Sequence, residues 1–64
     1  MTTEQLIQAI AEAGYQIHVG YHLGEINVAL STSPLCVDVD SYGETLHEAL
    51  TKAHAAVLAM MDYE

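Results

Sequence analysis

Positive charge is almost absent from this sequence. Lys52 is its only lysine or arginine, against nine acidic residues, so the formal net charge is −8 with the histidines neutral. Proteins that bind nucleic acid neutralise phosphates with lysine and arginine, and anionic membranes attract basic segments. The sequence therefore argues against direct contact with either. A basic protein partner or a cation fits this charge, and so does a plain role of the acidic residues in solubility.

Cysteine and long apolar runs are equally scarce. Cys36 is the single cysteine, which excludes a disulfide within the chain and favours a reducing, cytoplasmic location. The N-terminal segment has no basic region followed by an apolar stretch, so no signal peptide is expected. No apolar run approaches the roughly 20 residues of a membrane-spanning helix. At 64 residues we expect a single domain, 1–64, which would gain stability from a partner or from self-association.

Clear periodicity is what the sequence does contain. Thr2 and Gln5 match a capping box, and apolar residues follow at helical spacing. Gly14 then provides a stop, because glycine adopts the left-handed conformation that closes many helices. A helix is therefore predicted over 2–13. Its apolar stripe consists of Leu6, Ile7, Ile10 and Ala13.

The spacing of apolar residues then changes to two, which predicts β-strands at about 15–23, 26–30 and 35–40. With Leu23 and Gly24 as a two-residue hairpin loop, the apolar residues of the first two strands face one another. A four-residue loop over 31–34, which contains Pro34, joins the next two strands. The first predicted pairs are Tyr21 with Ile26, Val19 with Val28 and Ile17 with Leu30. The second are Leu30 with Leu35, Val28 with Val37 and Ile26 with Val39.

A long helix is predicted over 46–62. Thr45 and Glu48 form a second capping-box pattern, and Ser41 with Glu44 offers an earlier start. The order α-β-β-β-α predicts an α+β fold, a three-stranded antiparallel meander with two helices packed on one face. The other face of the sheet is then open to water or to a partner. The apolar stripe of the helix is Leu46, Ala49, Leu50, Ala53, Val57 and Met60.

Polar residues fall into rows across the open face in this register. The predicted rows are His22, Glu25 and Asp40, then Gly20, Asn27 and Asp38, then His18, Ala29 and Cys36. The set His22, Glu25 and Asp40 has the chemistry of a zinc, manganese or iron site. No metal-binding motif such as H-E-x-x-H accompanies it, so a solvated polar face is the simpler interpretation. We expect no metal and no other cofactor.

Enzymatic activity is not expected. Cys36 and His18 share a row but lie two strands apart, about 10 Å, which is too far for a catalytic dyad. The sequence contains no nucleophile elbow, no P-loop and no dinucleotide-binding glycine motif. A flat three-stranded face rarely holds a pocket for a small molecule.

The element order resembles that of the double-stranded RNA-binding domain, where two helices pack on one face of a three-stranded meander. That family binds RNA through basic residues at the start of its last helix. The matching stretch here, 43–56, has Glu44, His47 and Glu48 where lysines would be expected. The resemblance implies the topology and argues against RNA binding.

The same stretch resembles HicB-like antitoxins and short phage-encoded α/β-sandwich proteins, whose passage from strand to helix reads G-x-T-L-x-E-A-L-x-x-A. HicB-like proteins are acidic inhibitors of a basic RNase toxin and usually carry a DNA-binding segment, which these 64 residues do not show. The matching positions are Gly43, Thr45, Leu46, Glu48, Ala49, Leu50 and Ala53.

In composition the chain is similar to small acidic phage inhibitors. These include anti-CRISPR and anti-restriction proteins that mimic DNA and occupy the nucleic-acid site of a host effector. Carboxylates can pair with the arginine and lysine side chains that would otherwise bind phosphate, and long-range attraction speeds such association. We therefore expect a non-enzymatic module that binds a basic nuclease or CRISPR effector in the host cytoplasm.

The expected partner-binding residues are Glu25, Asp38, Asp40, Glu44 and Glu48. The alternative is a HicB-like antitoxin or a structural homo-oligomer, such as a homodimer, that associates through the open face or an edge strand.

Overall fold

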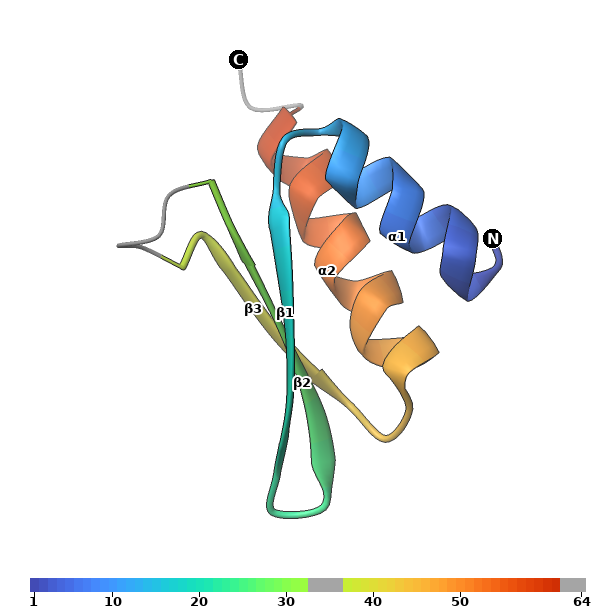
Figure 1. Cartoon of the computed structure of the whole chain (residues 1–64), viewed down its shortest axis with the longest axis vertical. Helices are drawn as coiled ribbons and strands as arrows, with labels where there is room; N and C mark the ends of the chain where they lie inside the picture. The colour runs from blue at the N-terminus through green and yellow to red at the C-terminus, as the bar shows by residue number, and fades with distance from the viewer. Residues whose placement is uncertain (33–36, 62–64) are drawn as a thin grey trace.

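The protein folds as one antiparallel sheet covered on one side by two helices, in a computed structural model that describes residues 1–32 and 37–61. The strands lie in the order β1-β2-β3, and both helices lie on the same side of them (Figure 1). The predicted α+β fold is confirmed. The elements are α1 (Thr3–Glu12), β1 (Gln16–His22), β2 (Glu25–Ser31), β3 (Val39–Gly43) and α2 (Leu46–Met61).

Local signals set both ends of α1. Thr2 and Gln5 form the predicted capping box, in which each side chain accepts the other residue's backbone N–H. At the other end Gly14 has φ +94°, and the N–H of Tyr15 donates to the carbonyl of Ile10. This is the Schellman closure that a glycine after the helix permits.

The β1–β2 hairpin has the predicted register, with Val19 opposite Val28 and His22 opposite Glu25. Leu23 and Gly24 form the loop, with φ +51° and +84°. Two positive φ values define a type I′ turn, whose twist matches that of the flanking strands. Leucine is an unusual residue there, because its Cβ disfavours the left-handed region.

The predicted register of β3 is wrong by four residues. Leu30 pairs with Val39 and Val28 with Ser41, whereas the prediction placed Leu35 and Val37 at these positions. A shift by an even number keeps every side chain on its face, so the alternation of apolar residues did not distinguish the two registers. Val37 lies before the strand and is 61% exposed. Leu35 lies outside the described residues.

This register places small residues beneath α2. Gly43 is buried, and a Cβ on it would lie 2.7 Å from the backbone nitrogen of Ala49. The Ser41 hydroxyl is also buried and lies 2.9 Å from the carbonyl oxygen of Ala49, to which it donates. The helix begins after Thr45, whose hydroxyl accepts the N–H of Glu48 at 3.1 Å. The alternative start at Ser41 is wrong, since Ser41 belongs to β3.

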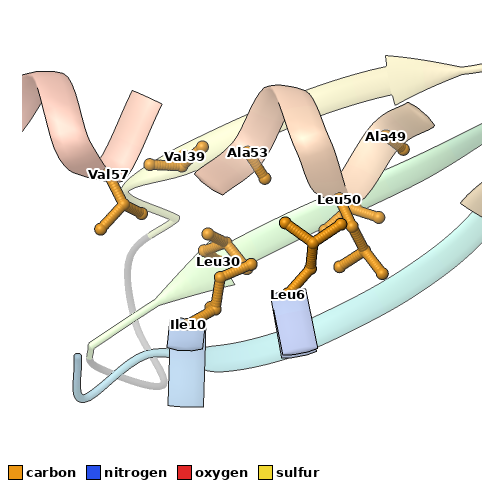
Figure 2. Close-up of a cluster of buried hydrophobic side chains, with 9 residues drawn as sticks. Leu6, Ile10, Leu30, Val39, Ala49, Leu50, Ala53 and Val57 are labelled. Atoms are coloured by element: carbon orange, nitrogen blue, oxygen red, sulfur yellow. The ribbon is translucent and has the colours of Figure 1, made fainter. Parts of the chain in front are cut away.

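The hydrophobic core lies between the two helices and β2–β3 (Figure 2). Most of the predicted helix stripes are buried, but Ile7 and Met60 are 39% and 47% exposed. The β1 side chains Val19 and Tyr21, predicted to face the core, are 58% and 75% exposed. The core residues are Leu6, Ile10, Val28, Leu30, Val39, Ala49, Leu50, Ala53 and Val57.

Candidate partner-binding surface

The side of the sheet that faces away from both helices is the candidate surface, and we call it the outer face. Alternation along each strand sends the residues between the core positions to this side. Two rows follow from the observed pairing, one of His18, Ala29 and Asp40 and one of Gly20, Asn27 and Tyr42. A further cross-strand pair, His22 with Glu25, closes the hairpin. The residues of the outer face are His18, Gly20, His22, Glu25, Asn27, Ala29, Asp40 and Tyr42.

The predicted rows change because β3 is displaced. Asp40 lies opposite Ala29, four residues along β2 from Glu25, or about 13 Å at strand spacing. The structure therefore does not bring Asp40 to His22 and Glu25. Among the described residues, no group of three or more His, Cys, Asp or Glu side chains is placed to hold a metal ion.

Asp38 belongs to the connection between β2 and β3 rather than to the outer face. Its carboxylate accepts hydrogen bonds from the backbone N–H and the hydroxyl of Thr32, at 2.8 and 2.9 Å. Its own N–H donates to the carbonyl of Leu30 at 2.8 Å. The prediction that Asp38 shares a row with Gly20 and Asn27 is wrong, and its carboxylate already has local partners.

Glu48 is also engaged within the chain. One carboxylate oxygen lies 3.3 Å from the Lys52 ammonium, and the other accepts the N–H of Glu44 at 3.4 Å. Lys52 further donates to the carbonyl of Tyr42 at 3.1 Å. The only lysine or arginine of the sequence thus connects α2 to the end of β3.

The other three predicted partner-binding residues lie on β2, β3 and the β3–α2 connection, with Glu25 near Glu44 and Asp40 farther along β3. Asp40 accepts a hydrogen bond from the Asn27 amide, which also donates to the carbonyl of Ser41 at 3.1 Å. Glu25 and Glu44 flank the pair Ile26–Gly43, where β2 meets the end of β3. Both are exposed, and within the described ranges 1–32 and 37–61 neither side chain has an ion pair.

The surface has the shape of a platform rather than a cleft. No pocket is present in the described part of the chain. His18 lies 3.4 Å from the Ser31 hydroxyl, while Cys36, its predicted row neighbour, lies outside the described residues. His47 of α2 has a contact within the chain, since its Nδ1 lies 3.1 Å from the Thr3 hydroxyl of α1.

Sequence reasoning missed a second exposed feature, the apolar end of the β1–β2 hairpin. The hairpin extends past both helices (Figure 1), and Tyr21 and Leu23 at its end are 75% and 89% exposed. The lengths of the elements could have indicated this extension of the hairpin. Ten residues of α1 span about 15 Å, whereas the seven residues of β1 span about 23 Å.

Comparisons with protein-family models, curated proteins and solved structures give no match to this chain. No helix among residues 1–32 and 37–61 is both long and apolar enough to cross a membrane.

Proposed function

We propose that this chain is a non-enzymatic binding module that inhibits a basic, nucleic-acid-handling host protein, as small phage inhibitors do. The observation that carries the proposal is an uncovered sheet face bordered by carboxylates in a chain of net charge −8. Glu25, Asp40 and Glu44 provide the negative charge at this face. A partner that binds phosphates with lysine and arginine offers the complementary surface.

The hydrogen bonds within the chain divide the five acidic residues into two groups. Asp38 and Glu48 hold the β2–β3 connection and the start of α2, so changing them would disturb the fold as well as any interface. Glu25 and Glu44 are exposed and have no such structural role among the described contacts. They are therefore the residues whose substitution tests binding most cleanly.

Charge complementarity also sets the expected kinetics. Long-range attraction raises the association rate and is screened by salt over about 10 Å at 0.1 M. Binding to the partner should therefore weaken steeply as sodium chloride is added. A duplex nucleic acid should compete, because it would occupy the same basic site on the partner.

The test uses affinity capture from a bacterial lysate at low and high salt, followed by calorimetry with the captured protein after purification. Glu25→Lys/Glu44→Lys is compared with Glu4→Lys/Glu12→Lys on α1. Both double variants change the net charge from −8 to −4, because each of the two substitutions adds two positive charges. We expect the first to lower the affinity by about tenfold or more, or about 1.4 kcal/mol, and the second to lower it far less.

Two results would overturn the proposal. Equal losses in both double variants would show that net charge alone acts, without a defined face. A captured partner whose affinity is unaffected by salt or by a nucleic-acid competitor would show that the acidic residues do not imitate phosphates.

A further inference from the structure

We propose that β1 is a dimerisation edge, at which two copies of this chain pair their β1 strands antiparallel about a twofold axis near Val19 and Gly20. The result is one continuous six-stranded sheet. Edge pairing of this kind was one of several alternatives that the sequence left open, and the structure identifies the strand. The inference is independent of the proposed inhibitory function, since it uses another edge and another set of residues.

The first support is exposed apolar surface concentrated on one strand. Val19 and Tyr21 on β1 are 58% and 75% exposed, and Leu23 in the hairpin loop is 89% exposed. Tyr21 and Leu23 belong to the end of the hairpin, which extends beyond the helices (Figure 1). Contiguous exposed apolar side chains on a small protein commonly mark an interaction site.

The second support is the backbone. Within the described residues β1 pairs only with β2, so its other edge presents unpaired peptide groups. In a two-residue hairpin the flanking pair, His22 and Glu25, is hydrogen-bonded, and bonding then alternates along the ladder. This directs the N–H and C=O groups of Val19 and Tyr21 toward the free edge.

The third support is the absence of the features that normally protect an edge strand. Proteins block such edges with lysine, proline, bulges or inward-pointing charges. The segment QIHVGYH of β1 has no proline and no acidic or basic residue apart from its two histidines, and its pairing with β2 is continuous over seven residues. The opposite edge, β3, is protected by Asp40 and by Glu44 just after it.

Charge favours a second copy as the occupant. Two molecules of net charge −8 repel wherever their carboxylates approach, and β1 is the strand with no carboxylate along its length. Pairing β1 with β1 separates the two β3 edges, which carry Asp40, by the full width of the joined sheet. A basic partner would gain no electrostatic energy at β1 and would bind the acidic side instead.

The strand is also complementary to itself. When two copies of β1 pair about a twofold axis, odd-numbered residues lie opposite odd-numbered ones on one face, and even-numbered residues lie opposite even-numbered ones on the other. With the axis at Val19, Ile17 lies opposite Tyr21 and Val19 opposite its own copy; with the axis at Gly20, Val19 lies opposite Tyr21 and Ile17 opposite Leu23. On the outer face, Gly20 then meets histidine in the first register and glycine in the second. Neither register about Val19 or Gly20 opposes an apolar residue to a charged one.

An interface of ordinary size would cover a large share of the surface of so small a chain. A typical stable interface buries about 800 Å² on each partner, which is close to a fifth of the 4398 Å² exposed by one copy. Leu23 adds a further indication. It occupies a turn position with φ +51° that favours asparagine over leucine, and it is 89% exposed.

The experiment measures the mass of the full chain by sedimentation equilibrium over a wide concentration range. We expect a dimer of twice 6.9 kDa that dissociates on dilution. The variant Val19→Lys/Tyr21→Lys places two charges on the β1 strip and should weaken dimerisation by about tenfold or more. The matched control Ile7→Lys/Leu58→Lys adds the same charge at exposed apolar positions of α1 and α2 and should leave dimerisation intact.

A second readout identifies the edge and guards against misfolded variants. Amide hydrogen exchange at Val19 and Tyr21 should slow as the protein concentration rises, and circular dichroism should confirm that both double variants remain folded. A monomer at every concentration would overturn the inference. So would a dimer that survives Val19→Lys/Tyr21→Lys but not Ile7→Lys/Leu58→Lys, since its interface would lie on the helices.

Discussion

Gly43 lies where β3 ends beneath the first turn of α2, and there is no room for a side chain. A Cβ would lie 2.7 Å from the nitrogen of Ala49 and 3.0 Å from the Cβ of Glu48. Because backbone atoms cannot move aside cheaply, we expect Gly43→Ala to lower the free energy of unfolding by about 1–3 kcal/mol. Thermal or urea unfolding followed by circular dichroism measures the change.

Gly20→Ala is the matched control, since a Cβ at Gly20 would meet only the Asn27 side chain at 4.0 Å. Alanine is favoured over glycine within a strand by about 0.5–1 kcal/mol, so this variant should be neutral or more stable. If both alanines had the same effect, close packing of β3 against α2 would not be the reason for glycine at 43.

Leu23 has a backbone conformation that is unfavourable for leucine. It sits at φ +51° in the hairpin loop and is 89% exposed, so its side chain contributes little to the core. We expect Leu23→Asn to raise the stability of the monomer by about 0.5–1 kcal/mol, because asparagine tolerates the left-handed region. Unfolding at low protein concentration tests this, with Leu58→Asn on α2 as the control for loss of an exposed leucine. A loss of stability in Leu23→Asn would show that the leucine makes a contact the fold requires.

Among the connections, the one between β2 and β3 depends on Asp38. Its carboxylate accepts two hydrogen bonds from Thr32, which tie the two ends of the connection together. We expect Asp38→Ala to lower the free energy of unfolding by about 1–2 kcal/mol. Glu44→Ala removes one charge without breaking a side-chain hydrogen bond of the described residues, so it should stay within about 0.5 kcal/mol of the parent. Equal effects of the two substitutions would contradict a structural role for Asp38.

Both helices and the first hairpin were predictable because their signals are local. Thr2 and Gln5 close the start of α1, Gly14 closes its end, and the loop at Leu23 and Gly24 fixes the β1–β2 register. The register of β3 was not predictable in the same way. A slip of four residues preserves the alternation of faces. The observed pairing is selected by the packing of Ser41 and Gly43 under α2 and by the hydrogen bonds of Asp38.

The candidate surface was predictable in outline and wrong in detail. Asp40 and Glu25 do point to the outer face, but the displaced β3 moves Asp40 out of the row of His22 and places Tyr42 beside Asn27. Asp38 and Glu48 have partners inside the chain, and the sequence did not reveal those contacts. The prediction that these residues bind a partner awaits the experiments above.

For the molecule as a whole, charge should limit stability. The chain has nine acidic residues and one lysine. Folding brings the negative charges closer together, and salt screens their mutual repulsion. We expect the melting temperature to rise between low and moderate sodium chloride, with a smaller rise in Glu25→Gln/Glu44→Gln. Calorimetry measures both, and sodium chloride is preferred over sulfate because sulfate also strengthens apolar burial. A melting temperature that fell with salt would show that the charges attract on balance.

The sequence alone determined the order and type of the elements, the faces of the strands and the acidic character of the surface. These follow from periodicity, capping residues and composition, which act over a few residues or depend only on totals. Tertiary structure decided the register of β3, the burial of Ser41 and Gly43, the exposure of β1 and the carboxylates that remain without internal partners. Those features depend on how the helices pack against the sheet, and that packing brings together side chains distant in the sequence.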